Sequence, residues 1–119
     1  VNIECNIYET SIGGTSVAGI FPHGAADCGA EDMAGNVWEW CATAWREDYK
    51  QYPRSSHELM IETIDTVEDW RGRRFVLRGG SWFNKLVLAR CVYRNGASAV
   101  SMYNSVGFRV ARRSCTPGP

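Results

Sequence analysis

The charged residues of this chain are sorted by sign along its length. All 13 acidic residues lie between Glu4 and Asp69 beside only three bases, and the other ten Lys and Arg residues lie between Arg71 and Arg113 with no acid. Unpaired charges are costly to bury, so the fold must bring the two parts together unless the basic part binds an anionic partner such as nucleic acid. The arginines are scattered among apolar residues, unlike those of a phosphate-binding face, and this favours mutual packing.

The chain has 119 residues, 45% of them hydrophobic, which suits one domain with one core. No apolar run approaches the roughly 18 residues that a membrane-spanning helix needs. We therefore expect a soluble protein with no membrane partner, and we slightly favour the cytoplasm as its compartment. The first residues, Val1 to Cys5, contain no initiator methionine and no signal-peptide pattern, which indicates a fragment, a processed chain or an excised domain.

The cysteines are odd in number and show no Cys-x-x-Cys spacing, which disfavours a zinc site. They are Cys5, Cys28, Cys41, Cys91 and Cys115. Either these thiols are reduced, as in a cytosol, or some of them pair with a segment outside this chain.

Alternating or β-rich segments predict a small antiparallel sheet that carries long, irregular loops. The expected strands are 37–41, 74–82, 89–94 and 105–112. Residues 1–30 are rich in Gly, Ser, Thr and Ala and are expected to form loops and turns. Residues 47–69 are polar and acidic, which predicts an excursion loop with a short helical turn at 55–64.

Three motifs follow one another in a fixed order: DMAGNVWEW at 32–40, LRGGSW at 77–82 and VGFRVAR at 106–112. Together they closely resemble the formylglycine-generating-enzyme (sulfatase-modifying factor) family, whose fold is a variant of the C-type lectin fold. The resemblance covers residues 1–119 but only the C-terminal portion of the family's domain. It implies an α+β, C-type-lectin-like fold whose N-terminal half is missing here and comes from a longer parent chain or a second piece.

The catalytic signature of the family is absent from its expected place. In the family's oxidases, two cysteines just after the Gly-Gly-Ser-aromatic motif bind copper, and soft thiolates suit Cu(I). Here residues 83–89 contain no cysteine, and Cys91 better matches a structural cysteine of the family. We therefore expect no copper and no catalytic residues, so that enzyme activity stays open with a preference against it. A related iron-dependent branch uses a histidine cluster on a separate domain, and this chain has only His23 and His57.

A calcium site is the one metal site that the resemblance carries over. The matching ligands are the Asp32 side chain, the carbonyls of Gly35 and Val37, and the Glu39 carboxylate. Calcium prefers such hard oxygen donors. The alternative is that Asp32 caps a turn and that Glu39 pairs with an arginine of the basic part.

Residues 78–110 form a candidate variable region between the fixed RGGSW and GFRV motifs. Variable proteins of diversity-generating retroelements use the same scaffold, and a reverse transcriptase rewrites their Asn codons at adenines. We predict that the positions aligned with such Asn codons bind a ligand. They are Phe83, Asn84, Lys85, Val87, Leu88, Tyr93, Asn95, Gly96, Ala97, Ser98, Ser101, Tyr103, Asn104 and Ser105. All but Lys85 are residue types that such rewriting can produce.

A scaffold that tolerates such substitution has to hold its fold with residues outside the variable positions. We expect that role for the buried aromatic residues Trp38, Trp40, Trp82 and Phe108, for Gly79, Gly80 and Gly107, and for the arginine donors Arg78, Arg94 and Arg109. Exposed Phe83, Val87, Leu88, Tyr93 and Tyr103 would then form an apolar binding patch, unless several of them belong to the core.

Three functions follow from these observations. The favoured one is a non-catalytic module, diversified by a retroelement, that binds a protein or other ligand through residues 83–105. The first alternative is an oxidase of the formylglycine-generating-enzyme family or a relic of one. The second is a nucleic-acid binder that uses the basic C-terminal part, which we disfavour.

Overall fold

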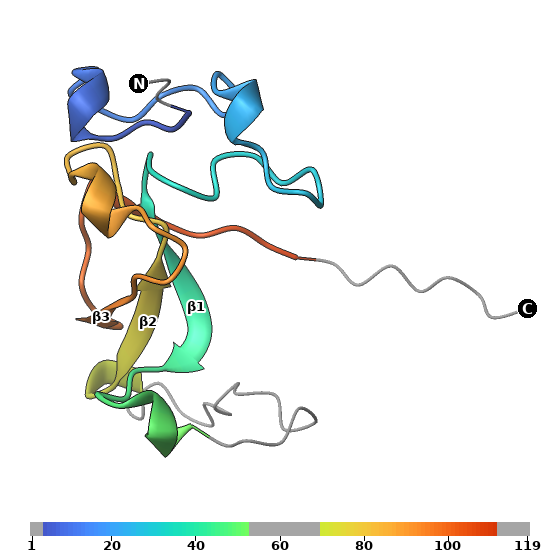
Figure 1. Ribbon diagram of the computed structural model, residues 1–119. Helices are drawn as coiled ribbons and strands as arrows, with labels where there is room; N and C mark the ends of the chain where they lie inside the picture. The colour runs from blue at the N-terminus through green and yellow to red at the C-terminus, as the bar shows by residue number, and fades with distance from the viewer. Residues whose placement is uncertain (1–3, 53–69, 112–119) are drawn as a thin grey trace, which may run out of the picture.

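The computed structural model describes residues 4–52 and 70–111, which form one small sheet with loops and short 3-10 helices around it (Figure 1). The strands are β1 (Trp38–Ala44), β2 (Arg74–Arg78), β3 (Asn95–Ser98) and β4 (Val106–Gly107), in the sheet order β3-β2-β1-β4. The 3-10 helices are η1 (Tyr8–Thr10), η2 (Pro22–Gly24), η3 (Tyr49–Gln51) and η4 (Leu86–Leu88). None of the helices in these two ranges is long and apolar enough to cross a membrane.

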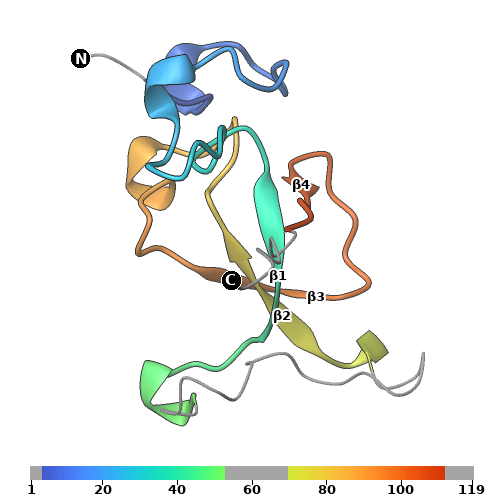
Figure 2. The ribbon, with the colours of Figure 1, turned by 90° about the vertical axis from the view of Figure 1, so that its right-hand side faces the viewer.

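The sheet is mixed, so the predicted antiparallel sheet is wrong at one edge. β2 is antiparallel to both of its neighbours, but β4 runs parallel to β1, with Trp38 opposite Val106. The chain leaves β3, passes β2 and β1 through the 99–105 loop, and joins the sheet on its far side (Figure 2). Such a crossover reverses the direction of the last strand relative to a simple hairpin.

The predicted strands at 37–41 and 74–82 correspond to β1 and β2, although β2 ends at Arg78. It ends there because Gly79 and Gly80 adopt φ values of 94° and 72°, outside the extended region. The predicted strand at 89–94 is wrong, since the Tyr93 amide bonds to the Arg90 carbonyl in a turn and β3 begins only at Asn95.

The predicted strand at 105–112 is reduced to the two residues of β4. Residues 4–30 contain two 3-10 helices and no strand, as expected for loops and turns. The predicted helical turn at 55–64 lies outside the described residues.

The core is small and centres on β1 and β2. Its buried hydrophobic residues are Ile7, Trp38, Ala44, Phe75, Val76, Leu77 and Ala89. Of the four aromatic anchors expected from the sequence, Trp38 is buried, whereas Trp40 and Trp82 are only half-buried. Phe108 is 76% exposed, because it follows β4 at the edge of the sheet, where no further strand among the described residues covers it.

The two oppositely charged parts of the chain meet through arginines, as the charge pattern predicts. Arg109 binds both carboxylate oxygens of Glu39, and Arg74 pairs with Glu47 at 3.6 Å. Arg94 donates to the carbonyls of Arg46 and Glu47 in the acidic part, whereas Arg78 donates to the carbonyls of Cys91 and Tyr93 within the basic part. The expected role of arginines as planar donors to carbonyls and carboxylates is therefore confirmed.

A buried turn at Gly35 and Asn36 joins three segments that are far apart in the sequence. The Asn36 amide donates to the Asn6 carbonyl at 2.7 Å, and the Gly35 amide donates to the Gly79 carbonyl at 2.7 Å. The Asn36 carbonyl in turn accepts from the Trp82 amide at 2.9 Å. Asn6 is fully buried, and its side chain donates to Gly14 and Asn36. The N-terminal loop, β1 and the RGGSW segment are thus fixed at one point.

Substituting Gly35 with alanine tests how strongly this turn holds the fold. Gly35 has φ of 75°, and a Cβ there would lie 2.3 Å from the Asn6 carbonyl oxygen. We expect Gly35→Ala to lower the free energy of unfolding by about 3 kcal/mol or more, measured by urea denaturation. Gly29→Ala is the matched control, because Gly29 has φ of 80° with no atom near its Cβ position and should lose only about 1 kcal/mol. Equal losses in the two variants would contradict a steric role for the turn.

Candidate functional site

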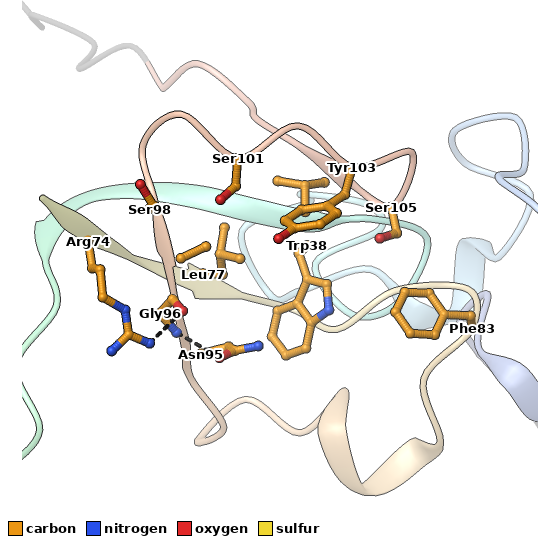
Figure 3. A pocket seen from close by; sticks show the side chains of 12 residues that line it. Trp38, Arg74, Leu77, Phe83, Asn95, Gly96, Ser98, Ser101, Tyr103 and Ser105 are labelled. Atoms are coloured by element: carbon orange, nitrogen blue, oxygen red, sulfur yellow. Dashed lines mark hydrogen bonds between the residues drawn. The ribbon is translucent and has the colours of Figure 1, made fainter. Parts of the chain in front are cut away.

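A pocket of about 390 Å³ opens between β3, the 99–105 loop and the centre of the sheet (Figure 3). It is lined by Trp38, Arg74, Leu77, Phe83, Asn95, Gly96, Ala97, Ser98, Ser101, Tyr103, Ser105 and Val106. Pockets of this size hold small molecules, and they are typically apolar with a few placed polar groups.

Sheet register brings the walls of the pocket together. β2 and β3 pair with Arg74 opposite Ser98 and Leu77 opposite Asn95. Trp38 enters from β1 next to β4, because its amide donates to the Ser105 carbonyl at 2.8 Å. The 99–105 loop then closes the pocket opposite the sheet.

The two ends of the pocket differ in chemistry. Trp38, Tyr103 and Phe83 lie toward one end, and Ser98 lies toward the other (Figure 3). The guanidinium of Arg74 donates to the carbonyl of Gly96, which also lines the pocket, at 2.8 Å and pairs with Glu47 at 3.6 Å. The lining therefore offers aromatic faces, hydroxyl groups, an amide and one guanidinium, which suit a ligand with a ring and polar groups.

Eight of the 14 residues predicted to bind a ligand line this pocket. They are Phe83, Asn95, Gly96, Ala97, Ser98, Ser101, Tyr103 and Ser105. The other six, Asn84, Lys85, Val87, Leu88, Tyr93 and Asn104, do not line it. Asn84 has a structural role, because its side chain accepts from Ser81 at 2.6 Å and its carbonyl accepts from the Tyr8 amide. The ligand-binding role of the 14 residues stays a prediction.

Sequence reasoning missed four residues of the pocket: Trp38, Arg74, Leu77 and Val106. Leu77 and Arg74 belong to a strand that the sequence identifies, but only the register with β3 places them opposite the variable positions. Trp38 and Val106 meet through the parallel pairing of β1 and β4, which no local pattern in the sequence signals.

Position 96 requires glycine because of packing and not because of contact with a ligand. A Cβ at this position would lie 2.4 Å from the Trp45 ring. That ring is itself fixed, because the guanidinium of Arg94 stacks over it at 4.1 Å and that of Arg74 at 5.3 Å. Arg94 also donates to the carbonyls of Arg46 and Glu47, as a planar donor group allows. A side chain at position 96 would therefore force the strand away from this stack.

The described residues place no metal-binding cluster near the pocket. Within 4–52 and 70–111, no group of three or more His, Cys, Asp and Glu side chains could hold a metal ion. Burial raises the pKa of the Cys5 and Cys41 thiols, which disfavours the thiolate form that binds soft metals.

Three of the four predicted calcium ligands, Asp32, Gly35 and Val37, precede β1, and the fourth, Glu39, lies in β1 and is already paired. Both of its carboxylate oxygens bind Arg109, and these bonds raise the pKa of the guanidinium. Arg109 also donates to the Asp32 carbonyl at 3.0 Å. Asp32 accepts from the Gly19 amide through Oδ2, and its buried Oδ1 has no hydrogen-bond partner among the described residues. Gly35 and Val37 contribute backbone carbonyls. With Glu39 bound to Arg109 in this way, calcium binding stays a prediction, and it requires Glu39 to leave Arg109.

Replacing Arg109 with glutamine tests this competition. Because the bidentate pair and two carbonyl contacts are lost, we expect Arg109→Gln to lower the free energy of unfolding by about 2 kcal/mol in the absence of metal. Excess Ca²⁺ should then raise the Tm of Arg109→Gln, where Glu39 is free, and leave the Tm of the unchanged chain as it was. An equal Ca²⁺-dependent rise in both proteins would show that Arg109 yields Glu39 to the metal.

Comparison with known proteins identifies relatives of this chain. The family model described as the sulfatase-modifying factor enzyme 1-like domain matches residues 3–114. The hercynine oxygenase of Mycolicibacterium thermoresistibile is 33% identical over 112 residues, which cover 85% of this chain and 23% of that protein. The serine/threonine-protein kinase Pkn1 of Chlamydia trachomatis is 33% identical over 84 residues, which cover 71% of this chain and 13% of that protein.

A solved structure supports the same assignment. PvdO from Pseudomonas aeruginosa superposes with a TM-score of 0.69 at 28% sequence identity, covering 88% of this chain and 37% of PvdO. The chain thus spans less than a quarter of the length of the curated relatives named above. Because the family model covers nearly the whole chain, this protein belongs to the sulfatase-modifying factor enzyme 1-like family.

Proposed function

We propose that this chain forms the substrate-binding wall of an oxygenase-type protein of its family. The observation that carries the proposal is the pocket beside β3, which gathers eight predicted ligand-binding residues from three separate stretches of the chain. The similarity to a hercynine oxygenase supports the oxidase alternative better than a purely non-catalytic module. In this proposal the 119 residues bind and orient the substrate, and any redox metal is held by residues other than those described.

Two features support binding, rather than bond-making chemistry, as the role of these residues. The pocket lining contains no His, Cys, Asp or Glu, so it offers neither a metal ligand nor a general base of those types. The same segment is also matched in a protein named a kinase, which indicates a module that can accompany different reactions.

Hercynine is the first ligand to test, because it is named in the relative's activity. We expect the 119-residue chain to bind hercynine saturably in isothermal titration calorimetry. Ser101→Trp should abolish this binding, because a large side chain would fill the pocket that Ser101 lines. Thr15→Trp is the control, since Thr15 is exposed and lies outside the lining. Equal binding by the two variants, or no saturable binding by the unchanged chain, would contradict the proposal.

A second proposal concerns how the pocket's ligand is chosen. Eight positions of the Asn-codon register line one cavity, and this supports diversification of the chain by a retroelement to change its ligand. The structural cost of variation differs among them. Tyr103 is 60% exposed and Phe83 is 49% exposed, so both can change freely, whereas Gly96 packs against Trp45.

Sequencing the gene in its source population tests this second proposal. We expect adenine-restricted variation within the codons for residues 78–109, together with a nearby template copy. Codon 96 should stay glycine in folded variants, because any Cβ there meets the Trp45 ring. An invariant window would contradict diversification and leave the pocket with one fixed ligand.

A further inference from the structure

The single Asn-Gly pair of the sequence, Asn95 and Gly96, lies in β3 and lines the pocket beside that strand. An asparagine before a glycine is chemically labile, because the peptide nitrogen of the glycine can attack the side-chain carboxamide and no Cβ of the glycine hinders it. In a folded protein the reaction further requires that the asparagine is exposed and that the glycine amide is not bonded within the sheet.

Asn95 meets the first of these conditions and Gly96 meets the second. Asn95 is exposed at the start of β3, which is an edge strand of the sheet. The Ala99 amide donates to the Arg73 carbonyl, and antiparallel strands exchange such bonds at every second residue. Residues 97 and 95 therefore bond to β2, whereas the amide of Gly96 points away from β2 toward the free edge of β3.

The amide nitrogen of Gly96 lies next to the group that it would attack. It donates to Oδ1 of Asn95 at 2.8 Å (Figure 3). Because this amide does not bond to β2, the attack breaks no hydrogen bond between the two strands. The Gly96 carbonyl accepts from the Arg74 guanidinium at 2.8 Å. A cation so close favours the deprotonated, anionic form of the peptide nitrogen, which is the attacking species.

Packing keeps the labile pair in the sequence whenever residue 95 is asparagine. A Cβ at position 96 would lie 2.4 Å from the Trp45 ring, so glycine is required there. The other asparagines of the described residues precede Ile, Val, Lys or Ser. Among them, Asn104 is exposed like Asn95 but is followed by Ser105, which makes it an internal reference for the effect of the glycine.

We propose that Asn95 deamidates spontaneously and thereby places a carboxylate in the lining of the pocket beside β3. The deprotonated Gly96 nitrogen forms a bond to Cγ of Asn95, and the side-chain nitrogen takes up protons and leaves as ammonia, which gives a cyclic imide. Water then opens the ring at either of its two carbonyl carbons, so that residue 95 becomes aspartate or isoaspartate. The sum consumes one water and releases one ammonia, and it needs no oxidant or reductant.

Both products change the wall of the pocket. The lining otherwise contains no Asp or Glu, so either product adds its first negative charge. Isoaspartate also adds one carbon atom to the backbone of β3, which disturbs the pairing of residue 95 with Leu77. The charge of the pocket therefore changes with the age of the protein, in a way that the gene does not encode.

A label from water tests the proposal on the 119-residue chain. The folded chain is incubated at neutral pH in water enriched in the heavy oxygen isotope, digested with pepsin in ordinary acidic water, and mapped by mass spectrometry. Opening of the imide in the folded chain incorporates the heavy oxygen, whereas deamidation during digestion does not. We expect labelled aspartate and isoaspartate at position 95 at least about tenfold faster than at Asn104, because the serine Cβ hinders attack there.

Asn95→Gln is the matched control, because it keeps the amide but would have to form a larger ring, and it should give no labelled product at position 95. The unchanged chain unfolded in urea supplies the rate without β3. Labelled product at Asn95 in urea but not in the folded chain would overturn the proposal, as would equal rates at Asn95 and Asn104 in the folded chain. Hercynine takes no part in this experiment, so its outcome is separate from that of the proposed function.

Discussion

The structure depends on the way in which the chain turns at Gly35 and Asn36. The two amides of this turn donate to carbonyls of residue 6 and residue 79, and the Asn36 carbonyl receives the amide of Trp82. Because buried backbone groups must be paired, a displacement of one of these segments leaves the group that it bonds in the turn unsatisfied. The left-handed φ values of Gly35 and Asn36 allow the two amides of the turn to point toward two different segments. This junction holds the residues just before β1 beside the N-terminal loop and the RGGSW segment.

Charge is distributed so that the arginines hold loops to the sheet. Arg78 reaches the carbonyls of the 91–93 turn, Arg94 reaches those of residues 46 and 47, and Arg109 reaches Glu39 with two further carbonyls. A guanidinium offers five donors in a plane, so a single arginine can fix a loop that has no regular backbone partner. A sheet with so few strands can carry long loops for this reason. This loop-fixing role of the arginines also explains why the basic residues are scattered through the sequence. The nucleic-acid hypothesis did not explain that scatter.

The sequence was sufficient for the motifs that are governed by local rules. Residues 38–41 of the predicted strand 37–41 lie in β1, and residues 74–78 of the predicted strand 74–82 form β2. The features that could not be predicted from the sequence depend on contacts between residues far apart in the chain. The direction of β4 depends on the path of the 99–105 loop, and the exposure of Phe108 depends on the absence of a neighbouring strand in the described part of the sheet. The sequence predicted only part of the pocket lining: the positions predicted to vary include its outer wall, while strand pairing alone brought in Leu77 and Trp38.

The core lies apart from the outer wall of the pocket, formed by β3 and the 99–105 loop, although Trp38 and Leu77 belong to both the core and the lining. The buried hydrophobic residues lie in β1, β2 and the segments beside them, whereas β3 and the 99–105 loop contribute a single buried residue, Ser105. Substitutions in that wall therefore remove little apolar burial and have little effect on the free energy of unfolding. Gly96 is the exception, because the Trp45 and Arg94 stack ties it to the rest of the chain. In the proposed binding role, this wall can change which ligand it accepts through side chains that the core does not need, while the hydrogen bonds at Gly35 and Asn36 stay unchanged.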